Sequence, residues 1–273
     1  MTVDVDGPRF AWRETGEGEV VALFHGLGGS RISWGPQMDG LGDRWRVAAW
    51  DMPGYGASAP LPDSPYTFRA LAAAAADWIC ELGVERAHIV GISMGAMIAQ
   101  YLAVWHPERV QTLTLMSTSS RFGLDGTMPD AWRAARLAPL DAGLEPAEFS
   151  ERVLRGIGGP QLSEPVLSDQ MAAMARVSGV ALRRSIDCLV THDTTRLLSS
   201  IIQHTLVLVG EFDSETPPEY SQYLVENLPH ARMVTIPHAG HLLNAEAPVQ
   251  VNRQLVAHLA AHPIVDPQHA EAQ

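Results

Sequence analysis

Lysine is missing from this chain of 273 residues, so all 19 of its basic side chains are arginines. Without a lysine side chain, Schiff-base catalysis and lysine-linked pyridoxal phosphate are excluded. Cysteine is also scarce, and two residues do not make a disulfide framework for a chain of this size. No apolar run approaches the roughly 20 residues of a membrane span, and the N-terminus lacks a basic and apolar leader. We therefore expect a cytoplasmic protein with no membrane partner.

The balance of charge and apolar residues limits the partners further. The formal net charge is −12, which disfavours nucleic acid and anionic lipid surfaces as partners. Apolar residues make up 46% of the chain, enough for one large core or two modest ones. A small molecule is thus the expected partner.

Short apolar segments alternate with helical ones along most of the chain. Such alternation predicts an α/β fold whose mostly parallel, twisted sheet has helices on both faces. The tail from Pro263 is polar and is expected to fray. Helices are expected at 68–82, after Ser93 and after Pro248. Strands are expected at residues 3–5, 10–13, 19–24, 45–50, 87–92, 110–117, 205–209 and 231–236.

One long segment, residues 119–204, breaks the alternation. Its pattern indicates short helices without a strand, and it contains nine Arg and ten acidic residues. We interpret it as a helical lid inserted after the sixth strand, because ligands of open α/β sheets bind at the carboxyl ends of the strands. The core would then comprise residues 1–118 and 205–273. The alternative is that these helices merely pack on the core.

A Gly-x-Ser-x-Gly motif lies between a strand-like and a helix-like segment, at Gly91-Ile92-Ser93-Met94-Gly95. A serine hydroxyl is a useful nucleophile only when a base takes its proton and neighbouring side chains leave it accessible. A sharp strand-to-helix turn leaves it accessible, and crowding there requires Gly two residues before and after the serine. Chance yields roughly 0.1 such pentapeptides in a chain of this composition, so the surrounding sequence must support the motif.

A serine nucleophile also needs a histidine base on a loop after a late strand. The loop after residues 231–236 contains two histidines. We favour His241 because it follows a Gly and precedes the closing helix, and His238 stays the alternative. A metal site at these histidines is disfavoured because no third ligand cluster is evident, and we expect neither metal nor cofactor.

The histidine in turn needs an acid that orients it, on the loop after residues 205–209. Asp213 is favoured because it lies in the middle of the loop, ahead of Pro217-Pro218. Glu211 and Glu215 are the alternatives. The chain order serine, acid, histidine differs from the orders in the chymotrypsin and subtilisin folds. The backbone N–H groups of Leu27 and Met94 would hold an oxyanion beside the serine.

Together these motifs resemble the α/β-hydrolase superfamily across nearly the whole chain outside the lid. The resemblance implies a triad of Ser93, Asp213 and His241, an oxyanion hole at Leu27 and Met94, and a structural role for His25. Around the serine the chain is similar to the 3-oxoadipate enol-lactonase group, although Ala96 stands where a Gly is more usual. The segments that carry the resemblance are His25-Gly26-Leu27, Asp51-Met52-Pro53-Gly54-Tyr55-Gly56-Ala57-Ser58, the Gly-x-Ser-x-Gly motif and His241 before the last helix.

The resemblance is specific for the triad and less so for the substrate. Related dehalogenases and epoxide hydrolases need an Asp at the position of Ser93, so the substrate is a small molecule with a carbonyl group. The favoured reaction is hydrolysis of an ester or lactone through an acyl-enzyme. Carbon–carbon hydrolysis of a β-diketone or vinylogous diketone uses the same triad, and perhydrolysis or a slowly hydrolysing ligand receptor are further alternatives.

The lid supplies candidates for substrate contact. An arginine there could hold a substrate carboxylate as a bidentate clamp. The alternative for each arginine is a surface ion pair. Trp132 would either line an apolar pocket or attach the lid to the core. The arginines considered are Arg133, Arg136, Arg183 and Arg184.

Overall fold

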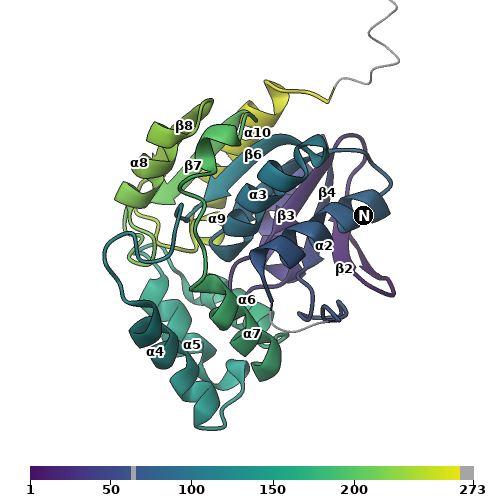
Figure 1. Cartoon of the computed structure of the whole chain (residues 1–273). Coiled ribbons are helices and arrows are strands. Elements are labelled where there is room, and N and C mark those ends of the chain that lie inside the picture. The colour runs from purple at the N-terminus through teal and green to yellow at the C-terminus, as the bar shows by residue number, and fades with distance from the viewer. Residues whose placement is uncertain (63–65, 265–273) are drawn as a thin grey trace, which may run out of the picture.

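The computed structural model describes residues 1–62 and 66–264, and its centre is one twisted eight-stranded sheet (Figure 1). The strands are short, and β3, β5 and β7 are buried along their whole length, as expected where both faces are covered. The strands are β1 (Val3–Asp6), β2 (Ala11–Thr15), β3 (Val20–Phe24), β4 (Arg46–Asp51), β5 (Ala87–Ile92), β6 (Val110–Met116), β7 (Thr205–Gly210) and β8 (Ala231–Ile236).

The strand order is β1-β2-β4-β3-β5-β6-β7-β8, and all pairs from β4 to β8 are parallel. The β1–β2 hairpin adds two antiparallel strands at one edge. Parallel strands place their carboxyl ends along one edge of the sheet, where ligands of such folds bind. The loops after β3, β5, β7 and β8 therefore meet at this edge.

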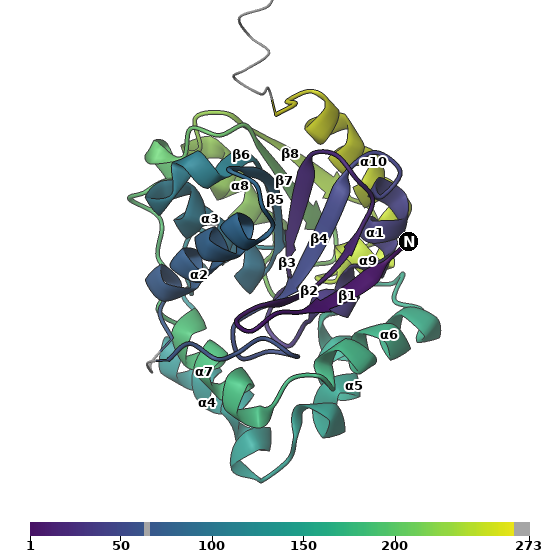
Figure 2. The same cartoon turned by 90° about the vertical axis from the view of Figure 1, so that its right-hand side faces the viewer.

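Helices cover both faces of the sheet (Figure 2). The face that α2 and α3 cover has an aromatic stack, in which the Trp50 ring lies 4.7 Å from Phe24 and 5.4 Å from Trp78 between centroids. Helices α2 (Phe68–Glu81), α3 (Met94–Trp105) and α8 (Pro218–Asn227) lie on this face. The opposite face is covered by α1 (Gly35–Leu41), α9 (Leu243–Glu246) and α10 (Pro248–Ala260).

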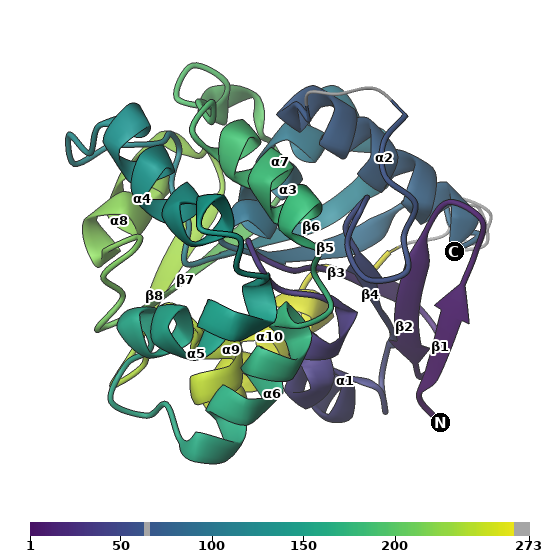
Figure 3. The ribbon, with the colours of Figure 1, turned by 90° about the horizontal axis from the view of Figure 1, so that it is seen from below.

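Four helices inserted between β6 and β7 form a lid across the carboxyl ends of the strands (Figure 3). The two chain segments at its base pair through an antiparallel bridge between Arg121 and Asp193. The buried Gln100 of α3 also joins them, donating to the Ser119 carbonyl and accepting from the Thr194 hydroxyl. The lid helices are α4 (Pro129–Asp141), α5 (Pro146–Ile157), α6 (Glu164–Met174) and α7 (Gly179–Leu189).

The predicted fold class is confirmed, including the helical insertion after the sixth strand. The domain limits at 118 and 205 stay a prediction; the lid helices fall within them. Most of the tail predicted to fray lies outside the described residues. None of the helices in the described ranges has both the length and the apolar character of a membrane span.

Candidate active site

Ser93 stands at a sharp turn between β5 and α3. Its backbone has φ 54° and ψ −122°, a region that a residue with a side chain rarely adopts. Its N–H donates to the Met116 carbonyl and its own carbonyl accepts from the Met97 N–H, so the end of β6 and the first turn of α3 hold the strained turn. The side chain is half-buried and lines a cavity beneath the lid.

The two glycines of the motif are needed because backbone passes close to them. A Cβ on Gly91 would lie 2.6 Å from the Ala96 nitrogen, and one on Gly95 would lie 2.1 Å from the Phe24 carbonyl oxygen. Neither neighbour is a flexible side chain that could move aside. The spacing that predicted a crowded turn thus has a direct steric basis.

The turn after β3 lies directly against the serine. A Cβ on Gly26 would lie 3.0 Å from the Ser93 Cβ and 3.6 Å from its Oγ, so only glycine leaves this side of the hydroxyl open. Among the described residues, no backbone hydrogen bond outside the helices and strands uses the N–H of Leu27 or Met94. The backbone thus leaves both donors unused, as the predicted oxyanion hole requires.

His25 supports this turn and is not a free base. Its Nε2 accepts from the Met52 N–H at 3.0 Å, so the proton is on Nδ1, which lies 2.9 Å from the Gly26 carbonyl oxygen. The ring is buried, and burial lowers its pKa. A neutral ring with both nitrogens bonded has a structural role, as the family resemblance implies.

Asp213 and His241 form a buried pair on the loops after β7 and β8. His241 Nδ1 lies 3.0 Å from Asp213 Oδ1 and 3.1 Å from Oδ2. The carboxylate also accepts hydrogen bonds from the N–H groups of Glu215 and Thr216 and from the Thr216 hydroxyl. Their exposed fractions are 3% for Asp213 and 7% for His241, so the pair is shielded from water.

The pair shifts both titrations in the direction that favours the ion pair. Burial raises the pKa of Asp213, but the charge of His241 and the hydrogen bonds outweigh it, and the pKa lies below its usual value. Burial lowers the pKa of His241, but the charge of Asp213, its hydrogen bond to the ring and the charge of Glu215 together outweigh burial, and the pKa lies above its usual value. The carboxylate is therefore suited to stabilise a protonated His241.

The alternative residues for the base and the acid do not form such a buried pair. His238 and Glu211 have side chains 67% and 48% exposed, and the His238 N–H donates to the Glu211 carboxylate. Glu215 forms an ion pair with Arg136. Of the residues proposed from the sequence, Ser93 and His241 line one cavity, and Asp213 lies behind His241.

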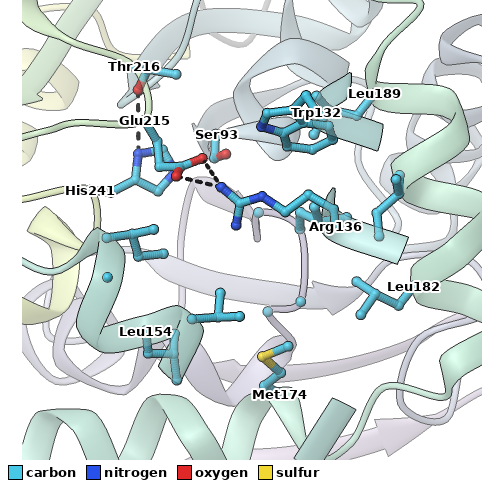
Figure 4. Close-up of a pocket in the computed structure, with 18 of the residues that line it drawn as sticks. Ser93, Trp132, Arg136, Leu154, Met174, Leu182, Leu189, Glu215, Thr216 and His241 are labelled. Carbon is cyan, nitrogen blue, oxygen red and sulfur yellow. Dashed lines mark hydrogen bonds and ion pairs between the residues drawn. The ribbon is translucent and has the colours of Figure 1, made fainter. Parts of the chain in front are cut away.

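The cavity has a volume of about 950 Å³, at the upper end of the range for small-molecule sites. Core loops supply its polar wall, with Ser93 and His241. Lid helices supply much of its apolar wall (Figure 4), through Trp132, Leu154, Met174, Leu182 and Leu189. Such a cavity suits a small molecule with an apolar part and one reactive polar group.

The lid residues proposed for substrate contact separate into two groups. Trp132 and Arg136 are four residues apart, share one side of α4 and line the cavity. The prediction for Arg133 needs correction, since it is turned about 100° from Trp132 and pairs with Asp187 of α7, away from the cavity. Arg183 and Arg184 do not line it either; they contact Asp141 and the Tyr66 ring.

Sequence reasoning missed Glu246. Its buried carboxylate accepts from the N–H groups of Gly159 at 2.8 Å, Gly240 at 3.0 Å and Leu242 at 3.1 Å. The His241 N–H donates to the Ile157 carbonyl at 3.0 Å. The loop that holds His241 is thus fixed on both sides, and tied to the end of α5. A Glu five residues after the histidine, just ahead of Pro248, was the available signal.

Comparisons with known proteins identify the family of this chain. A family model for the alpha/beta hydrolase fold matches residues 19–248. The chain is 30% identical over 244 residues to a pimeloyl-[acyl-carrier protein] methyl ester esterase of Neisseria meningitidis, which covers 86% of this chain and 92% of the relative.

Solved structures of similar fold include an esterase and an enol-lactonase. A malate-bound thermophilic esterase from Thermogutta terrifontis has a TM-score of 0.82 and 27% identity, covering 96% of this chain and 100% of that one. The enol-lactonase of Burkholderia xenovorans has a TM-score of 0.77 at 24% identity, covering 94% of this chain and 100% of that one, a likeness of fold alone.

Proposed function

Because the chain belongs to the α/β-hydrolase fold family and is an enzyme of its esterase type, we propose that it hydrolyses small carboxylic esters and lactones through an acyl-enzyme on Ser93. The observation that carries the proposal is the buried Asp213–His241 pair at 3.0 Å, in a site where His241 shares its cavity with the strained Ser93 turn. The esterase relatives support a small ester as substrate.

Acylation begins with the serine hydroxyl. His241 Nε2 takes the proton from Ser93 Oγ as this oxygen attacks the carbonyl carbon. The carbonyl oxygen becomes an oxyanion and accepts from the N–H groups of Leu27 and Met94. When the tetrahedral intermediate collapses, the bond to the alcohol oxygen breaks, and protonated His241 gives its proton to that oxygen. In a lactone the alcohol stays attached to the acyl group.

Deacylation repeats these steps with water. His241 takes a proton from a water molecule that attacks the acyl carbon, and the same two N–H groups hold the oxyanion. Collapse releases the carboxylic acid and returns the proton to Ser93. Throughout, Asp213 keeps the Nδ1 proton of His241 facing it, so that Nε2 stays free as the base.

The test is a hydrolysis panel with purified protein and its Ser93→Ala variant. The panel contains phenyl esters, an enol-lactone, a simple lactone and a vinylogous diketone. We expect hydrolysis of an ester or lactone that falls about 10⁵- to 10⁶-fold in the variant. A fluorophosphonate probe should modify Ser93 in the wild type alone, and Ser214→Ala, at another serine that lines the cavity, should retain activity.

Two results would contradict the proposal. If a folded Ser93→Ala variant stays active, Ser93 is not the nucleophile. If the diketone alone is hydrolysed, the enzyme is a carbon–carbon hydrolase that uses the same residues.

A further inference from the structure

The charged side chains that line the cavity cancel one another. Among the described residues these are two arginines and two acids, apart from His25 and His241. Asp125 and Arg152 are exposed to water, where their effect on a ligand is screened. Arg136 and Glu215 lie deeper, each with a side chain 27% exposed. The cavity therefore offers a substrate no net charge of either sign.

Arg136 is already paired inside the cavity (Figure 4). One of its terminal nitrogens donates to both oxygens of Glu215, at 2.5 and 2.6 Å, and its guanidinium lies 5.1 Å from the centre of the Trp132 ring. A substrate carboxylate at this cation would have to compete with a carboxylate belonging to the protein. Because Glu215 belongs to the same chain as Arg136, its carboxylate is present at the guanidinium at an effective concentration in the millimolar range or above.

The backbone of Glu215 is held in the acid loop, and this places its side chain within reach of Arg136. Its N–H donates to Asp213 Oδ1 at 3.0 Å, next to the bond that the Thr216 N–H makes to the same oxygen. Moving this backbone segment would disturb the carboxylate that orients His241. The same hydrogen bonds that hold the candidate acid thus fix the backbone from which the counterion of Arg136 extends.

Most of the remaining lid residues that line the cavity are apolar, and they include Leu154, Met174, Leu182 and Leu189. We propose that Glu215 determines specificity: by neutralising Arg136, it restricts the cavity to esters and lactones with an uncharged acyl part. This inference rests on the proposed hydrolysis of esters and lactones. The clamp considered from the sequence would make Arg136 select an acidic substrate. The structure favours the opposite role, because the cation has its counterion in place.

The test compares two esters that differ only at the end of the acyl chain. Phenyl hexanoate ends in a methyl group, and the phenyl monoester of adipic acid ends in a carboxylate. We expect the wild type to favour the hexanoate in kcat/KM by at least about tenfold. Glu215→Gln should raise the adipate-to-hexanoate ratio at least about tenfold, because the freed Arg136 can bind the substrate carboxylate. Effects on His241 are common to both esters and cancel in the ratio.

Two variants make the test specific. Glu211→Gln removes a charge from the same loop at a residue outside the cavity lining, and it should leave the ratio unchanged. The double variant Arg136→Gln with Glu215→Gln should lose the gain, because the freed cation is gone. Circular dichroism and the hexanoate activity show whether each variant is folded.

The outcomes separate this proposal from the proposed function. A wild type that favours the adipate monoester, an unchanged ratio in Glu215→Gln, or a gain that persists in the double variant overturns the role of Glu215. Failure of the wild type to hydrolyse phenyl hexanoate, or hydrolysis that survives Ser93→Ala, overturns the proposed function instead.

Discussion

The loops of the core and the helices of the lid meet at one cavity but are held in different ways. The core loops are fixed by buried hydrogen bonds, as at Asp213 and Glu246. The ion pairs inside the lid, such as Arg133–Asp187 and Arg183–Asp141, are exposed to water, which weakens them. In α4 the sole buried side chain is that of Leu137.

This difference assigns the two parts different tasks. The core holds the proposed catalytic residues and keeps Asp213 at hydrogen-bond distance from His241, which suits the precise positioning that catalysis requires. The lid supplies mostly apolar walls together with the compensated charge of Arg136, so the side chains on its part of the cavity wall can change to suit another substrate. Contacts near the site that join the two parts include Gly159 N–H to Glu246, His241 N–H to the Ile157 carbonyl, and the Arg136–Glu215 ion pair.

The variant with the largest expected effect tests whether the general base is His241, on a loop of the core. His241→Ala should lower kcat by about 10⁵- to 10⁶-fold, because the variant lacks the proposed base for the Ser93 proton. His238→Ala, three residues earlier on the same loop, should retain nearly full activity since its side chain is exposed. Steady-state kinetics on a phenyl ester measure both. A large loss in His238→Ala would mean that the base is assigned to the wrong histidine.

A smaller effect tests the connection between the two parts. Glu246→Gln keeps the size of the side chain but replaces one acceptor oxygen with an NH₂ group that faces backbone donors. We expect a loss of about 2 kcal/mol in the free energy of unfolding. For a chain of this size, that loss lowers Tm by about 4–8 °C. Calorimetry measures it.

Activity should fall in Glu246→Gln as well, about tenfold in kcat, because the loop that positions His241 loosens. Glu226→Gln, an exposed glutamate on α8 that bonds to Gln222, is the matched control and should change neither quantity. If Glu246→Gln lowers Tm but leaves kcat unchanged, Glu246 stabilises the fold without positioning His241.

The core could be predicted from the sequence because its signals are local. Continuous apolar runs such as residues 205–209 indicate strands buried on both faces, and steric crowding leaves Gly91 and Gly95 no alternative at the turn. The Asp213–His241 contact also followed from sequence order, since parallel strands bring the loops after β7 and β8 to one edge. The catalytic roles of these residues stay predictions.

The lid could not be predicted to the same depth. Its helices were expected, but which side of α4 faces the cavity depends on how that helix packs on the core, and Arg133 was misplaced for this reason. The pairing of Arg136 joins residues 79 positions apart, and that of Glu246 with Gly159 joins residues 87 apart. Such contacts leave no periodic signal in a single sequence.

The smallest expected effect is a shift in the pH dependence of kcat/KM, which depends on the charges that the core and the lid place near His241. Protonated His241 cannot accept the Ser93 proton, so kcat/KM for an uncharged ester should rise with pH. The midpoint should lie above the usual histidine value of about 6.5, because the charge and hydrogen bond of Asp213, together with the charge of Glu215, outweigh burial and raise the pKa of His241. Glu215 also raises this pKa and Arg136 lowers it. Glu215→Gln should therefore move the midpoint to lower pH, whereas Arg136→Gln should move it to higher pH. A pH profile of kcat/KM on phenyl hexanoate measures both shifts. If the two variants move the midpoint in the same direction, the ion pair does not act on His241 through its charges, and the lid's influence on the base is one of packing.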